Sequence, residues 1–594
     1  MALLEDALAV HNDDAVFTLA EMSFLGKYGY PRDYGRSAHL YEELAARTGN
    51  ATAQHRLGFM FATGVGGVKE KDQAKALLYH TFAADGGNIN SQMTVAFRHH
   101  AGISTPRDCE RATAYYKKVA DRAIAYVKDG PPGGKHVAKE AFHLADEEGG
   151  VYGEGASSSS AGHNAKQAGP TSDAGAAFDD VLEYLDLMSR KGEVKATFGL
   201  GRLHYDGSRA LKQDYHAAKN YFLDVARRYW TKDGKIKEDT EPSVDRYAAK
   251  AAGYLGRMFL RGEGMEQNFQ KARVWFKRGI DNGDALCEYS MGLMHLHGLG
   301  VNKDPVKAAE YFASAADQDF ASAQVRLGVL LMDQGDLASA LRYFEFATRH
   351  GHIEAFYYLA EISNQGIGRE RSCNTACLYY KMVAEKAEPL HSMFLEANNA
   401  YESGDVDMAM LGYMLAAEQG YEVGQANVAY LLDRPQRRSL FRFFTRRASS
   451  VLHDSALALV YWTRSARQAN IDSMVKMGDY YLYGSGTDLD REKAAACYTA
   501  AAETLQSAQA MWNLGWMHEN GIGIAQDFHL AKRFYDQSLE TNREAYLPVS
   551  LALLKLRARS AWNTFTHGKV NSIHDEPSKS LKLLSAYPSL DLQC

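Results

Sequence analysis

The sequence predicts an all-α solenoid built from repeated helical hairpins. Three observations carry this prediction: two short motifs that recur along the chain, a residue spacing within them that fits the helical period, and the chain length. The chain has 594 residues, of which 46% are hydrophobic and 24% charged, with only 12 prolines. Because a single core stops growing at about 250–300 residues, a chain of this length needs several domains or a repeat array.

The first motif marks the second helix of each hairpin. An alanine is followed three residues later by an aromatic residue, and four residues after that by a small residue. This spacing places all three side chains on one helical face. We expect the small residues to admit a neighbouring helix and the aromatic ring to fill the gap between repeats. The motif begins at Ala38, Ala76, Ala112, Ala218, Ala272, Ala308, Ala340, Ala376, Ala458, Ala495 and Ala531, with weaker copies at Val181 and Met410.

The second motif marks the first helix of each hairpin. It is a Leu-Gly or Met-Gly pair with another glycine six residues later, as in Met291-Gly292 with Gly298. A glycine inside a helix costs about 1 kcal/mol relative to alanine, so we expect a facing helix to pack closely against it. The later glycine is expected to end the helix with a positive φ. In some turns this later glycine begins a Gly-x-Gly sequence, as in Gly298-Leu299-Gly300. Such turns lack the preceding strand and third glycine of a dinucleotide-binding loop.

Adjacent motif alanines lie 32 to 38 residues apart where the array is regular. One hairpin cannot bury its own apolar face, so about 13 such helix-turn-helix units should stack into a superhelix. The period and motifs, as in MGLMHLHGLGVNKDPVKAAEYFASAADQ (291–318), resemble the Sel-one-like repeat family. The resemblance covers nearly the whole chain and implies an all-α, TPR-like superhelical solenoid.

Breaks in the period divide the chain into segments. We expect a disordered first insertion, because it contains Ser157-Ser158-Ser159-Ser160 and few large apolar residues. The predicted segments are N-terminal repeats (1–145), the disordered insertion (146–177), middle repeats (178–433), a basic aromatic insertion (434–454), C-terminal repeats (455–556) and a polar, flexible tail (557–594).

The second insertion is a candidate partner-binding segment. It combines arginines with phenylalanines, among them Arg438, Phe441 and Phe444. Such a basic amphipathic segment could lie on an anionic membrane surface or an acidic partner. The alternative is a loop held on the solenoid by its phenylalanines.

No motif for catalysis or for cofactor binding is found in the sequence. A nucleophile elbow, a phosphate-binding loop and a metalloprotease helix are all missing, and the 21 histidines are scattered. Cys373 and Cys377 lie without the further ligands of a zinc site. We expect the six cysteines to be buried small hydrophobes, while the geometry that a disulfide needs cannot be read from the sequence. We therefore predict no enzyme activity, cofactor or metal, and the net charge of −6 argues against nucleic acid as a partner.

The C-terminal repeats, notably residues 508–556 and 461–488, resemble one branch of the repeat family. That branch is the lumenal subunit of the membrane ubiquitin ligase of endoplasmic reticulum (ER)-associated degradation. The resemblance implies a non-catalytic adaptor in the ER lumen that receives misfolded glycoproteins. It also implies contacts with a multi-spanning RING ubiquitin ligase and an ER lectin.

Two features of that branch, a signal peptide and a transmembrane anchor, are not found in this sequence. We therefore interpret the chain as a lumenal fragment of a protein that is membrane-anchored in full length. The fibronectin-type module of animal members is also not found, which favours a fungal-type member. The alternative is a cytosolic repeat scaffold that organises a signalling complex. A glycan on Asn50, in the sequon Asn50-Ala51-Thr52, would favour the ER adaptor.

Two tryptophans are the remaining candidates for partner binding. The position after the Leu-Gly pair varies between repeats and is Trp516 in the last one, with Trp512 four residues earlier on the same face. Tryptophan is favoured at interface hot spots, so these residues are expected to contact a partner. The alternative is that they pack on the next repeat or on the segment around Trp562.

Overall fold

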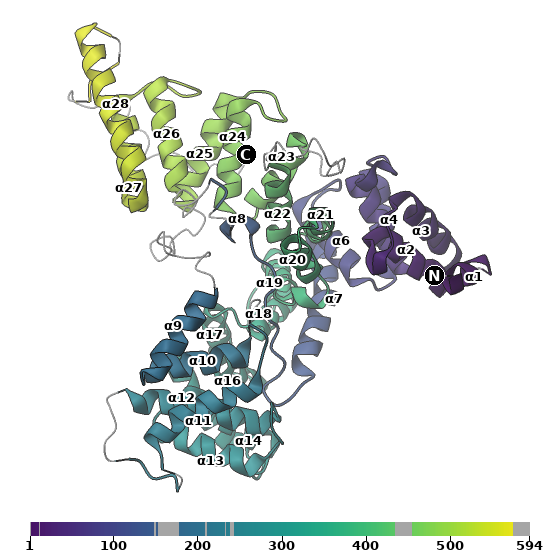
Figure 1. Cartoon of the computed structure of the whole chain (residues 1–594), viewed down its shortest axis with the longest axis vertical. Coiled ribbons are helices and arrows are strands. Elements are labelled where there is room, and N and C mark those ends of the chain that lie inside the picture. Colours follow the sequence, from purple (N-terminus) through teal and green to yellow (C-terminus); the bar gives the residue numbers. More distant parts are fainter. Residues whose placement is uncertain are drawn as a thin grey trace. The chain divides into compact units, whose positions relative to one another are not determined.

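The structure of the chain is a computed structural model. It describes residues 2–10, 12–147, 150–152, 178–207, 211–231, 233–237, 243–433, 454–568 and 570–573. Over these residues the fold is all α-helical, with one isolated antiparallel bridge between Trp230 and Ile236. The helices are arranged as stacked antiparallel hairpins (Figure 1), as the two motifs predict.

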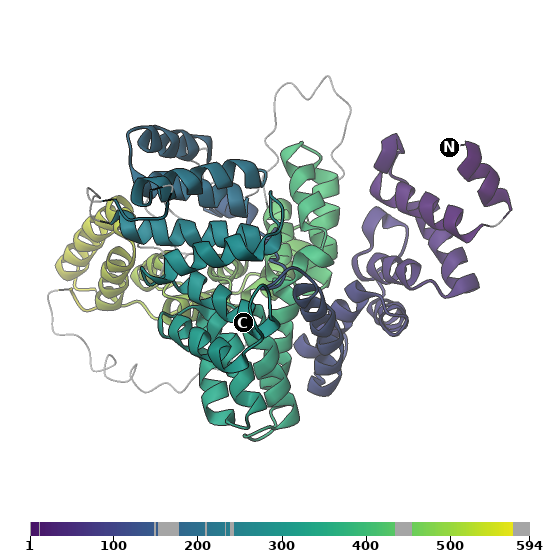
Figure 2. The same cartoon turned by 90° about the horizontal axis from the view of Figure 1, so that it is seen from below.

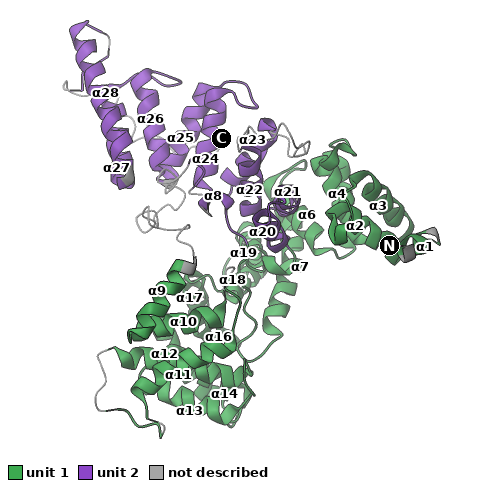
Figure 3. Cartoon of the chain, in the orientation of Figure 1, with its two compact units in different colours: residues 1–140, 178–391 green, residues 141–177, 392–594 purple. Residues whose placement is uncertain are grey.

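The chain divides into two compact units, which Figure 3 shows in different colours. Unit 1 comprises residues 1–140 and 178–391, and unit 2 comprises residues 141–177 and 392–594. The helices of unit 1 are α1 Ala2–Ala9, α2 Asp13–Leu25, α3 Tyr34–Thr48, α4 Ala51–Thr63, α5 Gln73–Asp85, α6 Ile89–Ala101, α7 Cys109–Lys128, α9 Phe178–Arg190, α10 Val194–Asp206, α11 Tyr215–Tyr229, α12 Val244–Arg261, α13 Phe269–Ile280, α14 Ala285–His297, α15 Pro305–Asp317, α16 Ala321–Asp333, α17 Leu337–Arg349, α18 Ile353–Gln365 and α19 Cys373–Lys386.

Unit 2 takes its first helix from the insertion and the rest from the C-terminal part of the chain. Its helices are α8 Leu144–Glu147, α20 Phe394–Glu402, α21 Val406–Glu418, α22 Glu422–Asp433, α23 Ser455–Ala466, α24 Ile471–Tyr483, α25 Arg491–Leu505, α26 Ala508–Asn520, α27 Phe528–Thr541 and α28 Tyr546–Phe565. Short 3-10 turns lie at Lys27–Gly29, Val65–Gly67, Glu388–Leu390 and Arg543–Ala545.

Local sequence signals set the ends of each hairpin helix, as α14 and α15 illustrate. The side chain of Asp284 accepts a hydrogen bond from the backbone of Cys287, which caps α14. Gly298 ends α14 in the left-handed region (φ 73°), where a side chain would be strained. Asp304 caps the next helix, and Pro305 occupies its first turn, where a missing backbone N–H costs nothing.

Where the first helix of a hairpin contains the Leu-Gly or Met-Gly pair, its glycine faces a ring of the second helix. A Cβ atom added to Gly292 would lie 2.6 Å from the ring of Phe312, and one added to Gly201 would lie 2.8 Å from the ring of Phe222. The predicted close packing of a facing helix is therefore confirmed. The ring that fills this space, however, lies four residues after the motif alanine. Phe312 is completely buried, whereas Tyr311, at the predicted position, is only half-buried.

The N-terminal repeats pack against the end of the middle repeats. Helix α7 lies beside α19 in unit 1 (Figure 1 and Figure 2). A disulfide joins Cys109 and Cys373, the first residues of the two helices. The Tyr357 hydroxyl of α18 also donates a hydrogen bond to Asp121 of α7 at 2.7 Å. The prediction that the cysteines are all buried small hydrophobes is therefore wrong for this pair, while Cys377 is free and buried.

Three predicted segment boundaries differ from the helix and unit boundaries of the structure. The first insertion was expected to begin at residue 146, but residues 144–147 form α8, and Tyr152 is hydrogen-bonded to Asp479. The middle repeats, expected to run from 178 to 433, are split between the two units after His391. The polar tail was expected from residue 557, but α28 continues to Phe565. Residues 153–177, 434–453 and 574–594 lie outside the described residues, so the predictions made for them are untested.

Candidate functional site

The C-terminal repeats end in a cluster that contains the first predicted tryptophan. Trp512 of α26 is partly buried, and its ring centroid lies 6.2 Å from that of Tyr535 on α27. The same cluster includes Val549 and Leu556, which α28 contributes and which are completely buried. Trp512 therefore packs on α27 and α28, and its role in partner binding stays a prediction.

A buried carboxylate joins α28 to the two preceding helices. Glu519 of α26 is completely buried and accepts a hydrogen bond from the Tyr535 hydroxyl at 2.9 Å. Its other oxygen lies 3.0 Å from the Arg559 guanidinium and 3.2 Å from the Lys555 ammonium, both on α28. Burial and the negative charge of Glu519 raise the pKa of Tyr535, so its hydroxyl remains a neutral donor. A buried charge that lost these partners would be strongly destabilising, so this network fixes the position of α28.

The outward face of α28 carries large apolar side chains in contact with solvent. Leu551 is 59% exposed and Phe565 is 77% exposed. The exposed apolar residues of this face are Leu547, Leu551, Leu554, Trp562 and Phe565. The helix contains three basic residues and no acidic one. We call these five residues the α28 apolar face. α28 is thus apolar both on the side that packs on the repeats and on this exposed side. A helix that is apolar on opposite sides is typical of a buried position, so the α28 apolar face is suited to binding a further partner.

The remaining predicted site residues lie in different parts of the chain. Trp516 is half-buried on α26, and its role in partner binding stays a prediction. Arg438, Phe441 and Phe444 lie outside the described residues. The α28 apolar face was missed because Leu547, Leu551 and Leu554 were counted among the C-terminal repeats, while Trp562 and Phe565 were assigned to a polar tail. The spacing of Leu547, Leu551 and Leu554 by four and three residues is the helical signal that could have revealed it.

Asn50 lies between α3 and α4, at the start of α4. Its side-chain oxygen accepts hydrogen bonds from the backbone N–H groups of Thr52 and Ala53 and so caps α4. A glycan would be attached to the side-chain nitrogen, which leaves the capping oxygen in place. Capping and glycosylation at Asn50 are therefore chemically compatible.

The chain is a helical-repeat protein whose candidate sites are surfaces for other macromolecules. Along the described part of the chain, no helix combines the length and apolarity needed to cross a membrane. Those same residues hold no group of three or more metal-ligating side chains placed to bind an ion.

The chain belongs to the Sel1 repeat family. The model of this repeat matches ten segments, which together cover more than half of the residues, and the expected Sel-one-like solenoid is confirmed. The protein is thus a non-catalytic repeat protein. The matched segments are residues 14–48, 51–88, 90–123, 194–223, 249–284, 285–320, 321–352, 353–387, 471–503 and 508–540.

Known proteins resemble the chain over nearly its whole length. An uncharacterised Sel1-like repeat-containing protein of Schizosaccharomyces pombe is 30% identical, over 93% of this chain and 83% of that protein. Protein sel-1 homolog 2 of Rattus norvegicus is 36% identical, over 92% of this chain and 72% of that protein. The ERAD-associated E3 ubiquitin-protein ligase component HRD3 of Candida glabrata is 26% identical, over 94% of this chain and 70% of that protein.

Proposed function

We propose that the protein is a non-catalytic adaptor of an ER-associated-degradation ubiquitin ligase complex. The observation that carries this proposal is the similarity, over more than nine-tenths of the chain, to a protein named as a component of such a ligase. A stack of helical hairpins supplies the extended surface that an adaptor needs. In this role the protein binds a multi-spanning RING ubiquitin ligase and an ER lectin, and it receives misfolded glycoproteins for retrotranslocation.

The disulfide supports a location in the ER lumen. Disulfides persist in oxidising compartments and are rare in the cytosol, and the Cys109–Cys373 disulfide links two helices far apart in the sequence. The sequon at Asn50 lies at a helix junction and is available for the same compartment. Both features favour the ER adaptor over a cytosolic scaffold. If the protein isolated from cells carried no glycan and had both cysteines reduced, the scaffold would be the better interpretation.

The α28 apolar face is the proposed contact with the ligase. It presents five exposed apolar side chains on a helix that Glu519 holds in place. Trp516 of α26 is kept as a second proposed contact. An apolar face of this kind gains affinity mainly by the removal of large side chains from water. Partner binding through it therefore depends on residues that contribute little to the stability of the repeat itself.

Affinity purification of the full chain from ER membranes tests this contact. The variant Leu551→Asp with Leu554→Asp should lose at least about tenfold of the co-purifying ligase, because two charges would be buried in the interface. The matched control is Val306→Asp, which replaces a 71% exposed apolar residue on α15 of unit 1. Ligase recovery equal to that of the control, in a variant with unchanged helicity, would overturn the proposed contact.

A further inference from the structure

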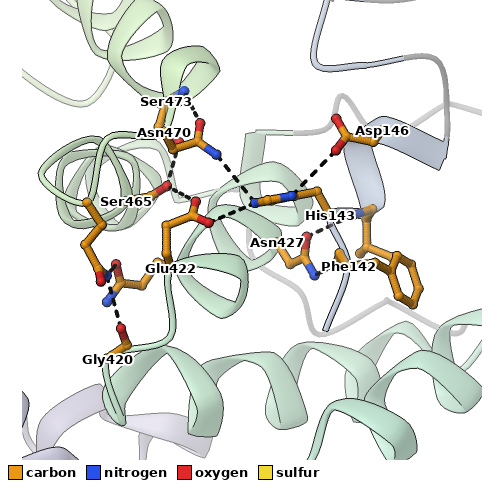
Figure 4. A network of polar contacts seen from close by, with 12 residues as sticks. Phe142, His143, Asp146, Gly420, Glu422, Asn427, Ser465, Asn470 and Ser473 are labelled. Atoms are coloured by element: carbon orange, nitrogen blue, oxygen red, sulfur yellow. Dashed lines mark hydrogen bonds and ion pairs between the residues drawn. The ribbon is translucent and has the colours of Figure 1, made fainter. Parts of the chain in front are cut away.

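A segment between α7 and α9 is held on the helical repeats of unit 2, largely by side chains of those repeats. We call residues 141–147 and 150–152 the inserted segment; it belongs to unit 2 and contacts α22 through α8. Figure 4 shows His143 of this segment pointing toward Glu422 and Asn470 of the repeats, with Asp146 on its other side. Its only helix, α8, has four residues, so most of its backbone hydrogen bonds must come from elsewhere.

One asparagine holds the main chain of the inserted segment. The Asn427 side chain on α22 accepts a hydrogen bond from the Leu144 backbone N–H at 2.9 Å and donates one to the Phe142 carbonyl at 2.9 Å. Asn427 is only 1% exposed. An amide side chain can satisfy both the donor and the acceptor of a peptide backbone. This contact therefore holds a peptide without depending on the identity of its side chains.

An acidic pocket receives the histidine of the inserted segment. The imidazole Nε2 of His143 lies 3.0 Å from the Glu422 carboxylate, and Nδ1 lies 3.5 Å from Asp146. Burial lowers the pKa of His143, but the hydrogen bonds to Asp146 and Glu422 outweigh it and raise the pKa to about 10. The imidazole is therefore positively charged at neutral pH. Asp472 also lines this pocket, so the pocket suits a cationic side chain.

Two further side chains of the inserted segment are anchored. Leu144, the first residue of α8, is 1% exposed, and α8 packs on α22. The Tyr152 hydroxyl donates a hydrogen bond to Asp479 of α24 at 2.8 Å, and the Lys476 ammonium lies 4.8 Å from the Tyr152 ring centroid. Such a cation–π contact adds to the specificity for an aromatic residue. The repeats thus bind the His143 and Tyr152 side chains and the backbone of the inserted segment, and Leu144 is buried between these contacts.

We propose that this face of α22 and α24 is a binding site for a short peptide of a partner protein. The preferred peptide has a cationic residue followed directly by leucine, with a tyrosine eight residues after the leucine. The inserted segment occupies the site as an internal ligand, and a partner peptide of this pattern competes with it. The site is separate from the α28 apolar face, so the two proposals fail or succeed independently.

Fluorescence anisotropy on the purified full chain tests this site. The probe is a labelled synthetic peptide with the sequence of residues 139–154. The variant His143→Ala with Leu144→Asp removes both anchors of the internal copy. We expect this released variant to bind the probe at least about tenfold more tightly than the wild-type chain, in which the tethered copy competes at an effective concentration in the millimolar range.

Two controls separate recognition of the peptide from nonspecific binding. Asn427→Ala in the released variant should weaken probe binding at least about tenfold, because two backbone hydrogen bonds are lost. A probe carrying glutamate in place of His143 should weaken it similarly, because a negative charge would face Glu422. No saturable binding to a folded released variant, or equal binding after Asn427→Ala, would overturn the proposal.

A second measurement applies if the released variant does not fold. In the wild-type chain, several millimolar unlabelled peptide should speed hydrogen exchange of the Leu144 N–H by displacing the internal copy. A scrambled peptide should leave that exchange unchanged. Exchange that is equal with both peptides would overturn the proposal.

Discussion

The packing between the helices of each hairpin can be tested with two glycines of one helix. Gly199 and Gly201 both lie in α10. A Cβ atom added to Gly199 meets no atom within 4 Å, whereas one added to Gly201 would lie 2.8 Å from the Phe222 ring and 3.2 Å from Cβ of Tyr221. Replacing either glycine by alanine gains about 1 kcal/mol of helix propensity. At Gly201 the overpacking costs a further about 1–3 kcal/mol.

We therefore expect Gly199→Ala to stabilise its hairpin by about 1 kcal/mol and Gly201→Ala to be neutral or destabilising by up to about 2 kcal/mol. Because the chain has two units, a single free energy of unfolding is not a suitable measure. Hydrogen exchange of the amides of α10 and α11 reports the local opening free energy instead. In Gly201→Ala, shortening Phe222 to leucine should restore part of the loss. Equal stabilisation by both alanines would refute the packing argument.

Three further predictions concern long-range contacts. Replacing Cys109 and Cys373 by serine should destabilise unit 1, by at most about 6 kcal/mol from the chain-entropy estimate for a separation of 264 residues; unchanged thermal unfolding and proteolysis would contradict this. Glu519→Ala should cost about 1–3 kcal/mol, because the buried Tyr535 hydroxyl loses its acceptor and the partly exposed Lys555 and Arg559 lose their counter-charge; hydrogen exchange should then increase in α28 and not in α10. Because its pKa is raised, His143 contributes fully to the stability of the fold below about pH 6.5, and this contribution falls as pH rises towards about 10. Because its pKa is lowered, the contribution of Glu422 to stability falls as pH drops below about 4.5. Intrinsic-rate-corrected protection of the amide that Asn427 binds should therefore decline from pH 7 to pH 9, and His143→Ala should flatten this profile.

In several motifs the buried aromatic ring lies one residue later than the sequence pattern predicts, which shows a limit of such patterns. Several hairpins carry adjacent aromatic residues, such as Tyr221-Phe222 and Tyr311-Phe312. The helical period of 3.6 residues lies between spacings of three and four, so both positions lie near the same face. Only the position of the facing glycine decides which ring is enclosed, and that position depends on how the two helices are aligned.

The C-terminal helix shows the same limit for an element boundary. Arg557 and Arg559 resemble the start of a polar tail in the sequence. In the structure Arg559 pairs with the buried Glu519, so its charge is a reason for the helix to continue. A charged residue is assigned to a surface by default, and its buried partner, forty residues away, can be identified only from the fold.

The sequence alone determined the repeated hairpins, their capping residues and their turn glycines, because these depend on contacts between residues close along the chain. It also predicted correctly that the glycine of a Leu-Gly or Met-Gly pair faces a neighbouring helix. Tertiary structure alone decided that α7 packs on α19 with a disulfide between them, and that residues 141–147 and 150–152 lie against α22 and α24. Those pairs of segments are separated by more than 200 residues, and repeats of similar surface chemistry offer many alternative partners, so local patterns cannot select among them.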